Sequence, residues 1–418
     1  LRQFAATELE SPLPPEVTAA AIPPSINLNP APLLSEPFTL ELATLALKQP
    51  MAAQHRSALE AALNSVVGQL PPWTVDQAPL RWQDGERAYT LVRQPAADAI
   101  SLERAILRVS MTEQGRLLEA EVPLTRMAFS HFAQVVDRWD PAVDLAGDRI
   151  DGRFHTNSSL YVSAAAGVAP TITGPTSVAG RVVIEGRGRR EDIFTRGLDT
   201  RVQRIPLPQQ PLDLEAFSVT QRVHRIEENG RLTFLPQGGY RWQPATAGSA
   251  SRHILPDGYP WLVQAAEDIE LQVEGSVRGH LLVYSPKRIS ISGSLRYVHD
   301  PRRGPSQDFL GLVSQGNVEI AAPQVTGPGD IDVQAVIFAV GQFRVRYYRS
   351  DDGGMLRLLG SVTAGSLSAT EPRFRTALEF DQRLEQQRPA HFPMTDRYKV
   401  EAGELLWTVA GGHPSNPR

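Results

Sequence analysis

The side chains in this sequence best suited to chemistry are arginines, which gather at three places. The densest group lies between residues 181 and 204, where seven arginines face four acidic residues. Its members are Arg181, Arg187, Arg189, Arg190, Arg196, Arg201 and Arg204. Gly186 and Gly188 would keep a loop there open, and guanidinium groups hold phosphate oxygens by two-point contacts. The group predicts a phosphate-binding loop, with a solvated loop of mutually paired charges as the alternative.

A second group reads Phe-Arg-Val-Arg-Tyr-Tyr-Arg and ends at Arg349. Arg344 and Arg346 alternate in the sequence, so they would share one face of a strand. A base could stack on Tyr347 or Tyr348 while the guanidinium groups follow a nucleic-acid backbone. A half-buried strand with an arginine outer face explains the same residues without any ligand.

Arg302 and Arg303 form a third group in a predicted turn, beside Tyr297 and His299. If the three groups align, they make a positive groove on a protein of formal net charge −4. Binding there would be electrostatic, indifferent to base sequence and strongly salt-dependent. We therefore predict DNA contacts at Arg187, Arg189, Arg190, Arg196, Arg302, Arg303, Arg344, Arg346, Tyr347, Tyr348 and Arg349.

Reactive groups of other kinds are few. There is no cysteine, which excludes disulfides, thiolate metal sites and a cysteine nucleophile. His155 lies near Asp148, Asp151 and Asn157 in a set that could bind a metal, although a hydrogen-bonded structural histidine is the commoner case. Residues 351–354 (Asp-Asp-Gly-Gly) could ligate calcium, but hairpin chemistry explains them. No catalytic or nucleotide-binding pattern occurs, so we expect no enzymatic activity, cofactor or metal.

The scaffold for these arginines is predicted from about residue 147 onward. A five-residue segment with apolar ends and a central glycine recurs there. Apolar residues alternate with others on either side of it, as in a β-strand. The repeats are Val273–Val277, Ile291–Leu295 and Leu358–Val362. Gly275, Gly293 and Gly311 follow at 18-residue steps, and Gly329 falls on the next step, which predicts glycines stacked at one corner. We predict a mainly β chain with a β-solenoid, and a sandwich of the same strands is the alternative.

Composition and periodicity divide the chain into four predicted segments. In residues 1–37 we expect the end of a helix and a proline-rich connector. Residues 38–146 predict a small α/β domain, with a strand from residue 38, a helix at 51–70, a hairpin at 105–122 and an amphipathic helix at 126–139 that caps the solenoid. Residues 147–365 predict the solenoid, with an irregular excursion at about 203–264. Residues 366–418 predict a helix at 376–387 and a strand at 405–409, returning to the first domain.

Several motifs resemble a known family. Phe129-Ser130-His131-Phe132, followed by Gly147–Asn157 (Gly-Asp-Arg-Ile-Asp-Gly-Arg-Phe-His-Thr-Asn), is similar to the opening of a bacterial domain family of unassigned function. That family is found in exported, type IV pilus-associated proteins of the PilX-like kind. Further matches keep the family's order, and these are Asp308–Val313, Gln334–Ala339, Leu358–Val362, Phe380–Leu384 and Phe392-Pro393.

The resemblance implies a pilin-like domain carrying an inserted or attached β-solenoid, a layout similar to that of a competence minor pilin. It implies a noncatalytic minor pilin at the cell surface or pilus tip, which binds extracellular DNA for natural transformation. Partners would be DNA and other pilins, with the membrane reached only through an N-terminal helix missing from this sequence. The sequence departs from the pattern at residues 203–264, which match no motif. The alternatives are a solenoid adhesin or pilus assembly scaffold without DNA binding, and a carbohydrate-active enzyme.

Overall fold

The computed structural model describes residues 49–50, 60, 63–64, 79–84, 87–113, 116–164, 169–212, 214, 222–246, 248–256, 258–350, 353–401, 404–405 and 407–409. Within these ranges the chain is mainly β, as predicted. The predictions for residues 1–37, for the strand starting at residue 38 and for most of the helix at 51–70 lie outside the described residues. None of the helices in the described ranges has the length and apolar character needed to span a bilayer.

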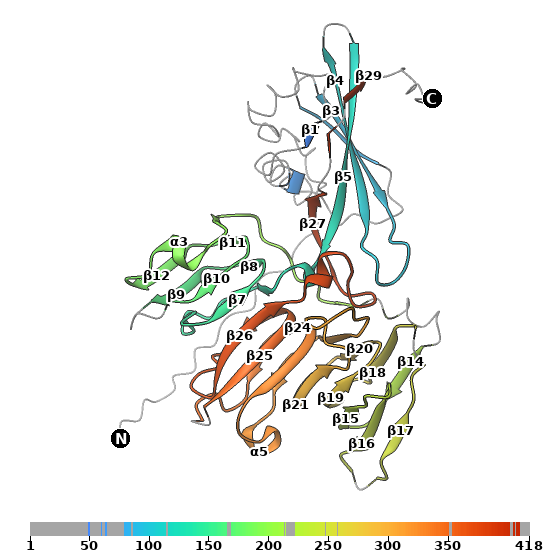
Figure 1. Cartoon of the computed structure of the whole chain (residues 1–418), viewed down its shortest axis with the longest axis vertical. Coiled ribbons are helices and arrows are strands. Elements are labelled where there is room, and N and C mark those ends of the chain that lie inside the picture. Colours follow the sequence, from blue (N-terminus) through green and yellow to red (C-terminus); the bar gives the residue numbers. More distant parts are fainter. Residues whose placement is uncertain are drawn as a thin grey trace, which may run out of the picture.

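An antiparallel sheet forms the upper part of the molecule in Figure 1. Its strands are β2 (Leu80–Asp84), β3 (Arg87–Gln94), β4 (Arg104–Glu113), β5 (Arg116–Ala128), β27 (Met394–Val400) and β29 (Trp407–Val409). β4 and β5 pair in antiparallel register, which confirms the predicted hairpin. β27 and β29, from the end of the chain, both pair with β5. Apart from this sheet, β1 (Gln49–Pro50) pairs with β28 (Glu404–Leu405).

The larger part of the molecule, which we call the parallel stack, contains strands that pair in parallel with strands further along the chain. These are β6 (Gln134–Val136), β7 (Arg149–Asp151), β8 (Phe154–Thr156), β9 (Leu160–Ala164), β10 (Thr171–Ile172), β11 (Thr176–Val178), β12 (Val182–Gly186), β13 (Leu198–Thr200), β14 (Val223–Ile226), β15 (Gly230–Phe234), β18 (Trp261–Ala265), β19 (Glu270–Val277), β20 (His280–Ser285), β21 (Arg288–Tyr297), β22 (Phe309–Ser314), β23 (Asn317–Ile320), β24 (Ile331–Val345), β25 (Gly354–Leu367) and β26 (Phe374–Phe380). Alternation, as in β9, sends one face of a strand into a core that runs through the whole stack. The solenoid is a finer description than the mainly β class, and it stays a prediction.

The chain enters this stack at its middle. β6 pairs in parallel with both β8 and β25, and β7 pairs with both β10 and β26. From β6 the chain runs outward to β12 and β13 at one end, crosses to β14 near the other end, and returns to β26 (Figure 1). Entry and exit therefore lie side by side, next to the antiparallel sheet.

Short helical turns make the joint between the two parts. The 3-10 turn η1 (Phe129–His131) connects β5 to β6, and η3 (Gln382–Glu385) lies between β26 and β27. The ring of Phe129 packs edge-on against Phe338 of β24 at 5.2 Å, and Phe392 packs against the same ring at 6.1 Å. Both connections are thus fastened to one aromatic side chain of the stack.

Two predicted helices are wrong. Residues 126–139 contain the end of β5, η1 and β6, and residues 376–387 contain most of β26 followed by η3. Every residue from Met127 to Val136 is buried. A segment buried on all sides shows apolar residues at helical spacing by accident, because period cannot be read where both faces are apolar.

The predicted glycine corner is wrong, and the segment predicted as an irregular excursion contains strands of the stack as well as irregular parts. Val273 lies opposite Ile291, an 18-residue step, but a bulge then places Gly275 opposite Leu295. Gly311 lies opposite Leu282 and Val336, at steps of 29 and 25 residues, because the connections between strands differ in length. Within residues 203–264, β14, β15 and β18 join the stack, whereas residues 203–212 form no strand and the antiparallel hairpin of β16 (Tyr240–Pro244) and β17 (Ser251–His253) departs from the parallel pairing.

Candidate functional site

The first arginine group lies at one end of the parallel stack. It occupies the end of β12, the short helix α3 (Arg190–Ile193) and the surroundings of β13. β12 pairs in register with β9, in a separate two-stranded sheet, and β13 pairs in register with β11. Figure 1 shows α3 and β12 at the far left of the stack, away from the antiparallel sheet. The group therefore lies at the end of the stack, on turns and short elements, and not on a strand that has paired strands on both sides.

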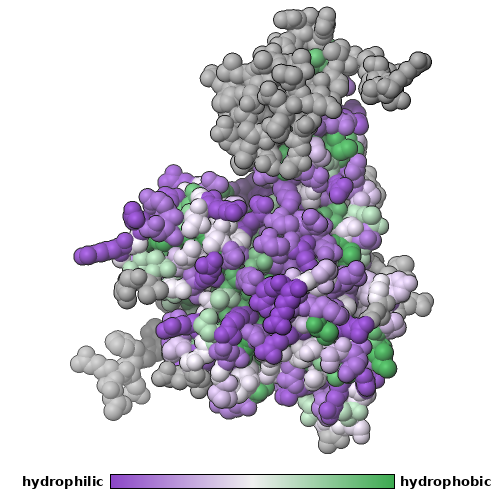
Figure 2. All heavy atoms as spheres, in the orientation of Figure 1, coloured by the Kyte–Doolittle hydropathy of each residue, from purple (hydrophilic) through white to green (hydrophobic). Residues whose placement is uncertain are grey.

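Several arginines at this end have no acidic partner among the residues that the structure describes. Arg187, Arg190 and Arg196 are exposed, and no carboxylate in the described ranges lies within ion-pair distance of them. Arg189 does form an exposed pair with Asp192, at 3.1 Å between Nε and Oδ2. Hydrophilic side chains project from this end of the molecule in Figure 2. The alternative of a fully paired loop thus applies to Arg189 but not to its three neighbours.

The second arginine group is held by one buried carboxylate. Glu319 of β23 is fully buried, and its Oε2 atom lies 2.7 Å from Nη2 of Arg344. Its Oε1 atom lies 3.7 Å from Nη1 of Arg346 and 3.6 Å from Nε of Arg288. Arg344 is directly opposite Glu319 in the parallel register. An arginine outer face on a half-buried strand therefore describes these two residues better than a nucleic-acid contact does.

The tyrosines and Arg349 that follow lie in a turn. Tyr347 has a φ of +51° and is 62% exposed, and the Arg346 guanidinium lies 5.6 Å from its ring centre. The exposed Arg349 guanidinium lies 5.4 Å from the ring centre of Tyr348. Each of these cation–π contacts covers one face of a tyrosine ring and leaves the other face open.

The third group is divided. Arg302 forms ion pairs with Asp300 at 2.6 Å and with Glu379 at 3.4 Å. The hydrogen bond from Arg302 lowers the pKa of Asp300 well below its ordinary value. Arg303 is exposed and has no carboxylate partner among the described residues. The positive groove predicted from three groups thus lacks Arg302, Arg344 and Arg346 as free charges.

Parallel pairing explains why these arginines are neutralised. Parallel strands in register place paired residues side by side across the sheet. A charged side chain on one strand therefore lies next to the paired side chain of the neighbouring strand. Glu270 faces Arg288, and Asp332 faces Arg357. Arg357 bonds both Asp332 and Asp330, the latter at 2.7 Å. Pairs of opposite charge on adjacent strands therefore recur in the middle of the stack.

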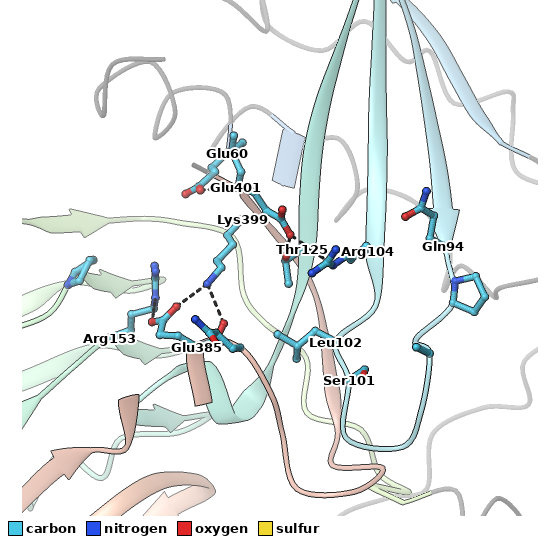
Figure 3. A pocket seen from close by; sticks show the side chains of 15 residues that line it. Glu60, Gln94, Ser101, Leu102, Arg104, Thr125, Arg153, Glu385, Lys399 and Glu401 are labelled. Carbon is cyan, nitrogen blue, oxygen red and sulfur yellow. Dashed lines mark hydrogen bonds and ion pairs between the residues drawn. The ribbon is translucent and has the colours of Figure 1, made fainter. Parts of the chain in front are cut away.

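A polar hollow of about 1030 Å³ lies at the joint between sheet and stack (Figure 3). Lys399 of β27 bonds Glu385 of η3 at 2.6 Å, and Arg153 approaches the same carboxylate at 3.6 Å. Burial by itself raises the pKa of Glu385, but Arg153 and Lys399 hold it below its ordinary value.

On the sheet side of the hollow, Glu401 accepts a hydrogen bond from Thr125 at 2.5 Å and lies 3.9 Å from Arg104. The charged side chains of the hollow therefore bond one another, and they tie the two parts of the molecule together. Sequence reasoning missed this cluster because Arg153 and Glu385 are far apart in the chain.

The predicted set around His155 proves to be a hydrogen-bond chain. His155 Nδ1 lies 2.7 Å from the Ser177 hydroxyl, and Nε2 lies 2.8 Å from Asn157 Oδ1. The Asn157 amide also donates to the Ile205 carbonyl and accepts from the Ile205 N–H, which fixes its orientation. Burial, with a smaller contribution from Arg397, lowers the pKa of His155 to about 4.

Neither of the two aspartates near His155 in sequence joins this chain. Asp151 accepts a hydrogen bond from Thr173, and Asp148 accepts one from the Ala146 N–H. Within the described part of the chain, no three His, Asp or Glu side chains gather in a way that could hold a metal ion.

Comparisons with known proteins give one distant likeness to report. No family model matches this sequence, and no curated protein matches it, so the PilX-like resemblance stays a prediction. Among solved structures, the fold is similar to the crystal structure of the competence-associated pilin ComZ from Thermus thermophilus. The TM-score is 0.35 and the identity 12%, over 82% of this chain and 89% of that chain.

Proposed function

We propose that this protein is a type IV pilus-associated minor pilin, exported to the cell surface or pilus tip, that binds DNA at the β12–α3–β13 end of its parallel stack. The observation that carries the DNA-binding role is the exposure of Arg187, Arg190 and Arg196, which have no acidic partner among the described residues. The pilus role is supported by the ordered series of family motifs in the sequence. Binding to other pilins belongs to the same proposal.

The local backbone suits contact with phosphate. Gly186 and Gly197 have φ values of +97° and +91°, which side chains other than glycine rarely adopt. The space around Gly197 is open to 4 Å. A phosphate can therefore approach the backbone closely here while guanidinium forks hold its oxygens. Such contacts carry no base information, which suits uptake of DNA of any sequence.

A salt series of DNA retention tests this proposal. The triple variant Arg187→Gln, Arg190→Gln, Arg196→Gln should bind duplex DNA more weakly, and its plot of log affinity against log salt should be shallower by about 2 to 3. A control with the same change in net charge removes three exposed arginines from the antiparallel sheet, as Arg81→Gln, Arg104→Gln, Arg108→Gln, of which Arg104 and Arg108 are ion-paired. It changes net charge equally and should keep the wild-type slope.

Two results would overturn the proposal. If the wild type retains no duplex even at low salt, the alternatives of an adhesin or an assembly scaffold stand instead. If both triple variants lose affinity equally, the binding reflects net charge and not this end of the stack.

A further inference from the structure

The opposite end of the stack exposes large apolar side chains beside arginines. This end is built from β14, β15, β18 and the β16–β17 hairpin, at the lower right of Figure 1. Ile254 is 70% exposed and Tyr259 is 54% exposed, and both lie in the connection from β17 to β18. Figure 2 shows hydrophobic and hydrophilic surface side by side in this region. Exposed apolar surface next to free charge is typical of a binding surface.

Two arginines face each other directly on the hairpin. Arg241 of β16 pairs in register with Arg252 of β17, and both side chains are exposed. No carboxylate in the described ranges forms an ion pair with either one. Like charges directly opposite each other in a sheet are destabilising, so this pair differs from the pairs of opposite charge in the stack's middle. An anion between the two guanidinium groups would offset the repulsion.

The exposed tyrosine has a rigid support. The Cζ atom of Arg222 lies 3.7 Å from the centre of the Tyr259 ring, and the Trp261 indole donates to the Pro256 carbonyl at 3.1 Å. This indole also packs edge-on against His224, with 5.5 Å between ring centres. One ring face of Tyr259 is thus held by a cation, which leaves the other for a ligand.

The aromatic layer continues beneath His224. Its Nδ1 atom lies 3.0 Å from the hydroxyl of the fully buried Tyr240, and the His253 ring stacks on Tyr240 with 4.9 Å between centres. Stacked and edge-on rings of this kind fix the position of the surface above them. A preformed surface loses little conformational entropy when a ligand binds.

We propose that this end of the stack binds single-stranded DNA, with bases stacking on Tyr259 and phosphates held by Arg241 and Arg252. The inference rests on the proposed function, and it names the form of DNA and a second contact surface. Unopposed arginines favour a polyanion over a neutral sugar. An aromatic side chain can stack on bases only where they are unpaired, which favours a single strand over a duplex. Arg241 and Arg252 lie on the outer face of the hairpin, opposite the face of Tyr240 and His253, so a single strand must cross the edge of β17 to reach both features.

Fluorescence anisotropy with a labelled oligothymidine and with a duplex of equal length tests the inference. Tyr259→Leu should weaken oligothymidine binding about 5- to 20-fold and leave duplex binding unchanged. The double variant Arg241→Gln, Arg252→Gln should weaken oligothymidine binding and flatten its salt dependence. Tyr347→Leu is the matched control, since Tyr347 is 62% exposed elsewhere on the stack, and it should change neither affinity.

Circular dichroism and thermal midpoints show that each variant folds. Unchanged oligothymidine binding in folded Tyr259→Leu overturns the inference, even if duplex binding still depends on Arg187, Arg190 and Arg196. Loss of binding to an acidic polysaccharide in that variant, with oligothymidine binding intact, identifies a glycan surface instead and also overturns it. A wild type that binds neither form of DNA fails the proposed function as well.

Discussion

Arginines in the middle of the parallel stack differ from those at its ends in whether they form ion pairs. In the middle, Arg288, Arg344 and Arg346 surround the buried Glu319, and Arg357 bonds two aspartates. At the ends, Arg196 and Arg241 are exposed without carboxylate partners in the described ranges. Arginine side chains thus form ion pairs on the sheet surface in the middle of the stack, whereas those at the ends remain available to a ligand.

The difference follows from what lies opposite each arginine. A strand inside the stack meets another strand on each side, and each can place an acid in register with its arginines. At the ends, Arg187, Arg190 and Arg196 lie in turns or in α3 and not on strands, and Arg241 of β16 has Thr233 and Arg252 in register, so none of them has an acid opposite it. Charge density along the sequence is therefore a poor guide to a binding surface in such a fold, and position in the stack is a better one.

Replacing the central carboxylate should have the largest effect. Glu319→Gln leaves Arg288, Arg344 and Arg346 without their shared counter-charge, and we expect a loss of about 3 kcal/mol in unfolding free energy. The arginines still reach solvent, which keeps the loss at the lower limit for breaking a buried pair. Urea unfolding measures it. The control Glu185→Gln, at the exposed end, should change stability by less than about 0.5 kcal/mol. Equal effects at both positions would contradict the contrast between middle and end.

Acid should weaken the chain of hydrogen bonds around His155. Its pKa is about 4 in the folded protein, below the ordinary 6.5, so the unfolded chain binds a proton first as the pH falls. The stabilisation is complete above pH 6.5 and is lost as the pH falls toward 4, with a contribution of roughly 2 to 3 kcal/mol.

Urea unfolding at a series of pH values should show a smaller acid loss in His155→Gln than in the wild type. His131 keeps its own contribution in that variant, because burial lowers its pKa to about 4 as well. Identical pH profiles for wild type and variant would show that His155 is not the titrating group.

The smallest effect is expected at Asp148. This residue directly precedes β7, which pairs with both β10 and β26. Burial raises the pKa of Asp148 to about 6, and the carboxylate of Glu371 raises it further. A raised acid pKa means that stability is greatest below the unfolded value of 3.8 and falls as the pH rises through 6. Asp148→Asn should therefore increase the free energy of unfolding at pH 7 by about 1 kcal/mol, which a slightly higher thermal midpoint would show. At pH 4 the substitution should give no increase. A gain of equal size at both pH values would contradict this account.

Local patterns predicted some elements well. The β4–β5 hairpin follows from alternating residues on both sides of a turn, and the mainly β class follows from many short apolar runs punctuated by glycine and proline. The same rules fail at residues 126–139, where burial on all sides hides the period. They also fail at residues 203–264, where strands of the stack are spaced irregularly by a hairpin.

Predicting the arginine groups from sequence succeeded only in part. Their positions are visible in the sequence, but the state of each guanidinium depends on a residue from another strand. Arg344 is neutralised by Glu319, which cannot be predicted without the strand register, and Arg302 also reaches Glu379, 77 residues further along the chain, beside its sequence neighbour Asp300. The aromatic end around Tyr259 was missed, because its rings come from four separate segments.

By itself, the amino-acid sequence determined that this chain is mainly β, that it can form no disulfide, and where its positive charge is concentrated. These properties depend on composition and on neighbours a few residues away. Only the tertiary structure decided which arginines are free, because parallel register brings together side chains tens of residues apart and the order of strands determines which turns have no further neighbour.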